Sequence, residues 1–126
     1  MQFGQSLPPL ELTSPLVGML QPWLHQQLHQ PITVDDMAAQ ATMSVRNFSR
    51  VFFKETGLTP AKFLEKMRLD TARKYLSETD QSIEQIATTC GLGGLVSMRR
   101  VFLRHLQITP SAYRNNFRTS LVREIA

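Results

Sequence analysis

Two short stretches of this chain carry hydrogen-bonding and apolar side chains along what would be one face of a helix. The residues are Arg46, Asn47, Ser49 and Arg50 in the first stretch, and Leu95, Val96, Arg99 and Arg100 in the second. Arginine can donate two hydrogen bonds to guanine, asparagine can pair twice with adenine, and leucine or valine can contact the methyl group of thymine. These residue types therefore favour recognition of base edges in DNA.

Catalysis and metal binding find less support in the sequence. His25 and His29 lie one helical turn apart, a spacing that can hold a metal ion, but no Glu, Cys or third His stands nearby. We interpret the pair as part of a solvated polar face. The sequence contains no nucleophile elbow and no glycine-rich phosphate loop. It predicts that the chain is not an enzyme and uses no metal or cofactor.

The two stretches belong to an internal repeat. Arg50-Val51-Phe52 recurs as Arg100-Val101-Phe102, and Thr59-Pro60 recurs as Thr109-Pro110. Earlier in each copy Met37-Ala38 matches Ile86-Ala87, and Ala41 matches Cys90. The offset is 49 residues before the turn and 50 after it, so the second copy has one extra turn residue, at Gly93-Gly94. Such a repeat indicates a duplicated supersecondary unit.

The first copy predicts a helix, a tight turn and a second helix. Thr33 caps a helix over residues 34–41, and Thr42-Met43 forms the turn. Ser44 caps a helix over residues 45–56, which ends at Gly57 in the left-handed conformation. The side chains expected on the inner side of this second helix are Val45, Phe48, Val51 and Phe52.

The second copy predicts the same arrangement. Ser82 and Gln85 form a capping box for a helix over residues 83–90. A turn over residues 91–94 leads to a helix over residues 95–106. Met98, Val101 and Phe102 are expected to point inward. A short helix, a turn and a second helix with a basic outer face is typical of a helix-turn-helix reader of DNA.

The remaining segments also predict helices, so the fold class is all-α with about seven helices and no strand. Ser14-Pro15 opens a helix toward Gln30, which Pro22 should kink or restart. Thr59-Pro60 opens a long helix to about Ser77, and Thr109-Pro110 opens a final helix to about Phe117. The predicted organisation is a flexible lead or former linker over 1–13, a first lobe over 14–60, a linker helix over 60–77, a second lobe over 78–118 and a tail over 119–126.

Composition and charge limit the class of partner. The chain has 126 residues, 42% of them apolar, and a net charge of +4. The charge is uneven, because residues 1–45 hold no Lys or Arg while residues 85–123 hold six arginines and no acid. This asymmetry indicates a polyanion as partner. No apolar run approaches a membrane span, the first residues do not resemble a signal peptide, and the single cysteine fits a reducing cytoplasm.

Residues from about Pro31 to Phe117 resemble the DNA-binding domain of the AraC/XylS transcription regulators. The resemblance is carried by I-A-x-x-C-G-L at 86–92, R-x-F at 100–102 and T-P-x-x-Y-R at 109–114. The stretches M-S-V-R-N-F-S-R-V-F at 43–52 and S-M-R-R-V-F at 97–102 are most similar to members with an amidotransferase-like sensor domain. The chain departs from the family pattern at Leu92, Gly94 and Gln107. We expect the second reading helix to lack a side-chain N-cap at Gly94 and to have a different C-cap at Gln107.

The resemblance implies a bacterial transcription regulator. We expect an activator, although the sequence itself leaves activator and repressor open. It implies two helix-turn-helix lobes bridged by the helix over 60–77, with the helices over 45–56 and 95–106 in successive major grooves of double-stranded DNA. It also implies an N-terminal sensor domain, absent from this sequence, and RNA polymerase as a further partner. Two different readers in one chain suit an asymmetric site, so we expect the domain alone to be monomeric.

Phosphate contacts are expected from residues beside the reading positions. The candidates are Ser44, Lys54, Arg104, Arg114 and Arg118. With about six phosphates neutralised, the logarithm of the binding constant should fall against the logarithm of salt with a slope near −5. Because Leu95 and Val96 stand outermost in the second lobe, that lobe is expected to read bases weakly and mainly to hold phosphates.

Two alternatives remain open at this point. Phe53 and Leu103 hold equivalent places after each R-V-F, where they either pack within their lobes or form a docking patch for a sensor domain or a polymerase subunit. The rival function is a helical protein-interaction domain that does not bind DNA.

Overall fold

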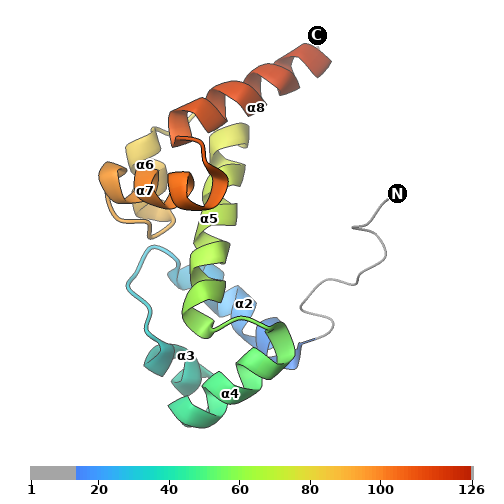
Figure 1. The fold of residues 1–126 in the computed structure, drawn as a ribbon, viewed down its shortest axis with the longest axis vertical. Helices are drawn as coiled ribbons and strands as arrows, with labels where there is room; N and C mark the ends of the chain where they lie inside the picture. The colour runs from blue at the N-terminus through green and yellow to red at the C-terminus, as the bar shows by residue number, and fades with distance from the viewer. Residues whose placement is uncertain (1–13, 126) are drawn as a thin grey trace. The chain divides into compact units, whose positions relative to one another are not determined.

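The computed structural model describes residues 14–125, with side chains described up to residue 118. The described residues form helices and no strand: α2 Pro15–Gln27, α3 Val34–Gln40, α4 Val45–Thr56, α5 Pro60–Glu78, α6 Ile83–Thr89, α7 Leu95–Leu106 and α8 Pro110–Ile125 (Figure 1). The all-α prediction is confirmed. The predicted lead over residues 1–13 lies outside the described residues.

Helix boundaries follow the capping residues that the sequence offers. Thr33 and Asp36 form a reciprocal capping box at α3, and Ser82 and Gln85 form one at α6. Ser44 caps α4 by accepting a hydrogen bond from the backbone N–H of Asn47. Capping therefore fixes where these helices start, as predicted.

Two helices differ from the prediction. α2 continues through Pro22 without restarting and ends at Gln27, short of the predicted Gln30. A kink at Pro22 stays a prediction. α8 continues to Ile125, although the sequence predicted an end near Phe117 and a tail beyond it. No proline or glycine follows Phe117, so nothing in the sequence stops the helix there.

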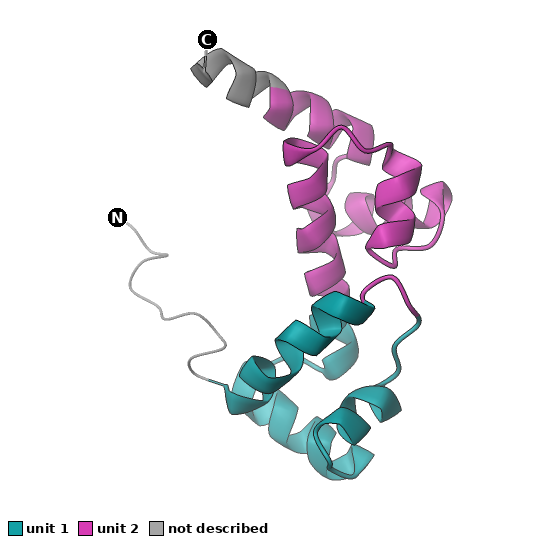
Figure 2. Ribbon diagram, turned by 180° about the vertical axis from the view of Figure 1, so that it is seen from behind, with its two compact units in different colours: residues 1–27, 31–64 teal, residues 28–30, 65–126 magenta. Residues whose placement is uncertain are grey.

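The described helices form two compact units (Figure 2). Unit 1 comprises residues 14–27 and 31–64, and unit 2 comprises residues 28–30 and 65–125. Each unit contains one copy of the repeat, and α5 contributes its first turn to unit 1 and the rest to unit 2. The predicted division into two lobes and a separate linker helix stays a prediction.

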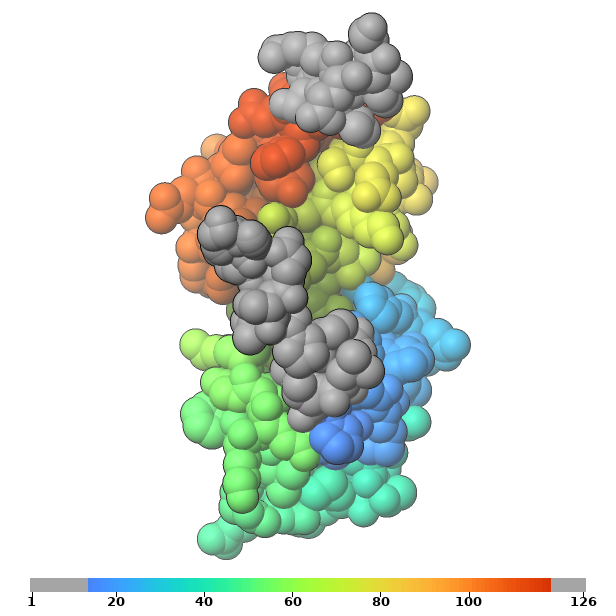
Figure 3. Space-filling view, turned by 90° about the vertical axis from the view of Figure 1, so that its right-hand side faces the viewer, coloured from blue at the N-terminus to red at the C-terminus, as the bar shows by residue number. Residues whose placement is uncertain are grey.

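The core of unit 1 is built around the aromatic residues of α4. Phe48 and Phe52 are fully buried, with ring centroids 5.5 Å apart, and Phe52 meets Phe63 of α5 edge to face at 5.3 Å. α2 is attached to α4 through the carboxylate of Glu55, which accepts hydrogen bonds from the Ser14 hydroxyl at 2.6 Å and from the Leu16 backbone N–H at 3.3 Å. Figure 3 shows the surfaces of α2 (blue) and the end of α4 (green) side by side. Contacts with α2 and α5 therefore hold α4 in place within unit 1.

The core of unit 2 lies between the later part of α5 and helices α6, α7 and α8. Its buried residues are Leu69, Ala72, Leu76, Ile86, Ala87, Cys90, Leu92, Met98, Val101, Phe102 and Tyr113. Met98, Val101 and Phe102 are buried as predicted, so the opposite face of α7 is left to solvent. In Figure 1, α6 and α7 lie beside this part of α5.

Candidate nucleic-acid interface

Three cations form an exposed ridge along α4. Arg46, Arg50 and Lys54 are exposed and follow one another at intervals of four residues, which places them on one face of the helix. Asn47 is exposed beside them, and its Oδ1 accepts a hydrogen bond from Arg50 Nη2 at 2.6 Å. Because the acid of this helix, Glu55, is turned toward α2, the ridge carries positive charge without a counter-charge from its own helix.

Two residues of α4 are placed differently from the prediction. Val45 was expected on the inner side but is 39% exposed, and Ser49 was expected on the outer side but is half buried. Val45 is the first residue of the helix, where no preceding turn covers the side chain. Ser49 lies one turn further along the same flank. The outer ridge is therefore narrower than the predicted set.

The outer face of α7 is exposed as predicted. Val96 has 73% of its surface exposed and Leu95 49%, and both Arg99 and Arg100 are exposed. Within residues 14–118 neither of these guanidinium groups has a hydrogen bond or ion pair. Gly94 gives no side-chain hydrogen bond at the start of the helix, as predicted. All four candidate base-reading residues of the second copy are thus accessible.

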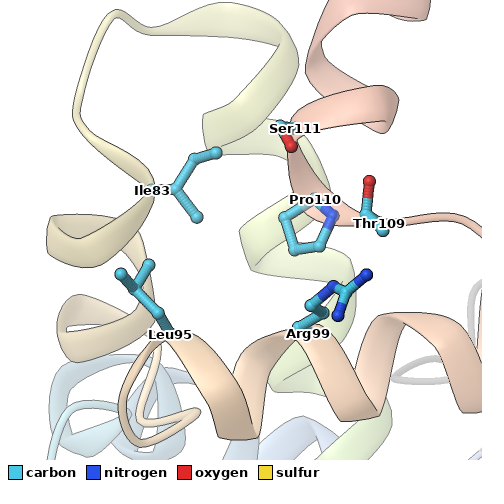
Figure 4. A pocket seen from close by; sticks show the side chains of 6 residues that line it. All are labelled: Ile83, Leu95, Arg99, Thr109, Pro110 and Ser111. Atoms are coloured by element: carbon cyan, nitrogen blue, oxygen red, sulfur yellow. The ribbon is translucent and has the colours of Figure 1, made fainter.

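Two of these four residues line a surface hollow of about 320 Å³, and the other two lie outside it. Leu95 and Arg99 line the hollow with residues of α6 and α8, as Figure 4 shows. The other lining residues are Ile83, Thr109, Pro110 and Ser111. Val96 and Arg100 do not line the hollow and occupy the ridge that corresponds to Arg46 and Arg50 in α4.

The candidate phosphate-binding residues near the ridges remain partly available. Lys54 is exposed, and within residues 14–118 it has no ion pair. Ser44 is exposed, and its oxygen accepts the Asn47 N–H at 3.2 Å, so its hydroxyl proton can still be donated. Arg104 donates to Glu65 Oε2 at 2.6 Å, and His105 Nε2 lies 3.5 Å from the other oxygen of Glu65.

The guanidinium groups of Arg114 and Arg118 are engaged within unit 2. Arg114 donates to the backbone carbonyls of Leu76 and Thr79, each at 3.1 Å. Arg118 donates to Thr79 at 3.3 Å and pairs with Asp80. Burial, and then the charge of Arg118, lower the pKa of Arg114. The phosphate role stays a prediction for both, but this geometry speaks against it, because contact with DNA would break bonds that hold the end of α5.

Glu65 is a residue of the site that the sequence did not reveal. It lies 39 residues before Arg104, and no local pattern links the two. Its carboxylate sets the position of a predicted phosphate contact at the C-terminal part of α7. Only tertiary packing brings these residues together.

Other features of the surface bear on the alternatives. Phe53 is 55% exposed and Leu103 is 40% exposed, so the docking hypothesis for these residues stays open. His25 and His29 are exposed, and the described residues contain no group of three potential metal ligands. No helix in the described part of the chain is long and apolar enough to span a membrane.

Comparison with known proteins identifies the family. Residues 37–116, more than half of the chain, match a family described as helix-turn-helix domain. A transcriptional regulator of Chromobacterium violaceum with an AraC-type DNA-binding domain has the same fold, with a TM-score of 0.73 and 29% identity over 80% of this chain and 90% of that one. The chain belongs to the AraC-type helix-turn-helix family.

Other relatives agree with this assignment. The DNA-binding domain of AdpA, solved in complex with a target DNA, superposes with a TM-score of 0.76 and 34% identity over 85% of this chain and 96% of that one. The HTH-type transcriptional regulator Rv1931c of Mycobacterium tuberculosis is 40% identical over 84 residues, 67% of this chain and 32% of the relative. The HTH-type transcriptional activator RhaS of Klebsiella pneumoniae is 34% identical over 94 residues, 75% of this chain and 34% of the relative. The chain thus spans about a third of the length of these two relatives.

Proposed function

We propose that this AraC-type domain binds double-stranded DNA in a sequence-specific manner, with α4 and α7 each entering a major groove. The observation that carries this proposal is the repetition of one arrangement in both units. In each, a buried aromatic or apolar face fixes the second helix of a helix-turn-helix, and the opposite face presents arginines to solvent. A helix of this kind reads bases with the residues near its N-terminal end.

Within this proposal the residues have two kinds of role. Arg46, Arg50 and Arg100 have the reach and the donors to bind guanine, and Asn47 has the amide to bind adenine. Ser49, Leu95 and Arg99 lie on the neighbouring flank and contact bases or sugars at the edge of the groove. Ser44, Lys54 and Arg104 bind phosphates, which position the domain without specifying sequence.

We further propose that the domain is part of a bacterial transcription activator. Two relatives support this role, one named an HTH-type transcriptional activator and the other an HTH-type transcriptional regulator. About two thirds of each lies outside the matched region, which leaves room for the sensor domain that the family resemblance implies. RNA polymerase is the proposed partner for activation, and the site of action is the cytoplasm.

A double charge removal tests DNA binding. Arg46→Ala with Arg50→Ala should weaken binding to a sequence obtained by in-vitro selection by at least tenfold, since each lost base contact costs about 1–3 kcal/mol. The matched control is Lys62→Ala with Lys74→Ala, which removes two charges from exposed positions of α5. The control should change specific binding far less, and circular dichroism should show a retained fold in both variants.

The same measurement separates the two function classes. If the Arg46 and Arg50 variant keeps its fold and its specific affinity, the helical protein-interaction function is favoured. Failure of the intact chain to enrich any sequence during selection would lead to the same conclusion.

A further inference from the structure

Helices α4 and α7 match residue by residue, and they differ at the first position of the exposed ridge. With the offset of 50 residues, Arg46, Arg50 and Lys54 of α4 correspond to Val96, Arg100 and Arg104 of α7. The match holds in space as well as in sequence, because Phe48 and Phe52 are buried in α4 as Met98 and Phe102 are in α7. The ridge of α4 therefore begins with a cation, Arg46, whereas the ridge of α7 begins with an apolar residue, Val96.

Folding does not account for Val96. Among the large apolar residues described as exposed, it has the highest exposed fraction, 73%. Its neighbour Leu95 lines the hollow with Ile83 and Pro110, whereas Val96 does not (Figure 4). The equivalent position in unit 1 is an arginine in a helix with equivalent bounds, so the fold does not need an apolar side chain there.

The first turn of α7 also lacks the hydrogen-bonding groups of α4. Ser44, which caps α4, is replaced by Gly94, where a Cβ would meet no atom within 4 Å, so no side chain caps α7. Asn47 is replaced by Ser97, which is half buried and packs near Gly93. At the start of α7, the most exposed side chain that could meet a base pair is therefore that of Val96, with its two methyl groups.

We propose that Val96 contacts the C5-methyl group of a thymine, so that unit 2 selects thymine at the step where unit 1 places Arg46 on guanine. The inference rests on the proposed DNA-binding function. Valine cannot hydrogen-bond, and the apolar group that a base pair presents in the major groove is the thymine methyl. On this proposal unit 2 recognises a specific base, whereas the sequence led us to expect that it mainly holds phosphates.

The test removes a single methyl group from the DNA. A site is first obtained by in-vitro selection with the intact chain, and a Val96→Ala selection identifies the thymine whose preference is lost. Replacing that thymine by deoxyuridine should weaken binding of the unchanged protein about fourfold, the effect of one buried methyl group. The same replacement should leave the affinity of the Val96→Ala variant unchanged.

Two further variants sharpen the result. Val96→Arg should shift the preference at that step from thymine to guanine, while Leu103→Ala, an exposed apolar change at the other end of α7, should leave it at thymine. Equal affinity of the unchanged protein for the thymine and deoxyuridine sites at every thymine of the half-site overturns the inference. That outcome still requires a selected site, so it differs from failure of DNA binding itself.

Discussion

The arginines of this chain divide according to what their guanidinium groups contact. Arg46, Arg99 and Arg100 project into solvent without a protein partner in residues 14–118. Arg73 donates to the Tyr113 hydroxyl at 3.2 Å, a bond that raises the pKa of the guanidinium. Arg114 serves as a clamp on backbone carbonyls. Residue type alone does not separate the arginines that face solvent from the one that holds the backbone at the end of α5, whereas their contacts do.

Removal of the Arg114 clamp should affect stability more than DNA binding. Arg114→Ala removes the charged donor from the Leu76 carbonyl and one of the two charged donors from the Thr79 carbonyl, where Arg118 remains. Hydrogen bonds to charged groups contribute about 1.5–3 kcal/mol. Because the group is partly exposed, we expect a loss of about 1 kcal/mol in the free energy of unfolding, measured by urea denaturation. If Arg114→Ala keeps full stability but binds DNA more weakly, the predicted phosphate contact of Arg114 is favoured instead.

The buried thiol of Cys90 makes stability depend on pH in the alkaline range. Burial raises the pKa of Cys90 from 9.0 to about 11, although the charge of Arg68 opposes this shift. The folded state therefore keeps the thiol proton to a higher pH than the unfolded state does. The contribution of the protonated thiol to the free energy of unfolding is full below pH 9 and is lost as the pH rises toward 11. We expect the free energy of unfolding to fall by up to about 2 kcal/mol across this window.

The first copy supplies the control for this experiment. Ala stands at position 41, equivalent to Cys90, so Cys90→Ala is a substitution that the repeat already tolerates. The variant should lose this alkaline component of the decline. An identical pH profile for both proteins would assign the decline to other groups.

At the scale of the elements, two equivalent positions have a positive φ in both copies of the repeat. Glycine occupies one of these positions in the first copy and the other in the second copy. The turn between the helices has Thr42 at φ 54° in the first copy and Gly91 at φ 72° in the second. The end of the reading helix has Gly57 at φ 77° in the first copy and Gln107 at φ 58° in the second. The expectation of a different C-cap at Gln107 was therefore wrong. The tertiary position of the next helix requires the left-handed conformation, whichever residue must adopt it.

Gln107→Gly should stabilise the protein. A non-glycine residue in the left-handed region costs roughly 1–2 kcal/mol, and the Gln107 backbone N–H already makes the bond to Leu103 that closes the helix. We expect a gain of about 1 kcal/mol in the free energy of unfolding, measured by thermal or urea denaturation. Lower stability in the glycine variant would show that the Gln107 side chain contributes more than the strain costs.

Gly91→Ala should be far more damaging than Gly57→Ala. A Cβ at Gly91 would lie 2.1 Å from the Leu28 carbonyl oxygen and 2.8 Å from Arg68 Nε, whereas one at Gly57 meets nothing within 4 Å. Since both positions have positive φ, the difference isolates the steric clash. We expect losses of about 1–2 kcal/mol at Gly57 and at least about 3 kcal/mol at Gly91 by urea denaturation. Equal losses would mean that the backbone at Leu28 can yield.

At the scale of the whole molecule, two equivalent units carry different candidate reading residues. Each unit holds its own reading helix on its own core, so a change of reading residue in one leaves the other intact. The asymmetry of chemistry, arginine and asparagine in α4 against valine and arginine in α7, suits a DNA site without a palindrome. Under the proposed function, the repeat supplies two equivalent helices, and their different exposed side chains supply the specificity for DNA.

The salt dependence of DNA binding reports how many phosphates the whole chain neutralises. With Arg114 and Arg118 occupied inside unit 2, about four phosphates remain of the six first expected, and the slope should be about −3.5 in place of −5. Lys54→Ala should make the slope shallower by about 1, and Arg114→Ala should leave it unchanged. Fluorescence anisotropy over a series of KCl concentrations measures all three. A slope near −5 that drops in the Arg114 variant contradicts this assignment.

Local sequence was sufficient for most of the elements and for the exposed reading face. Ser44, Ser82 and Gly57 act on groups within four residues of themselves, so the bounds of α4 and the start of α6 could be predicted. The position of α7 was equally clear, because its buried residues recur at helical spacing. The exposed set of α7 followed from the same periodicity.

The sequence by itself determined two helix-turn-helix units and the faces that meet solvent, because caps and periodicity act between near neighbours. Only the tertiary structure decided which cations are free. The partners of Arg104 and Arg114 lie 35 to 39 residues away, and the Leu28 carbonyl that restricts Gly91 belongs to a distant segment. Contacts at such separation depend on how the helices pack, and no spacing within either copy encodes them.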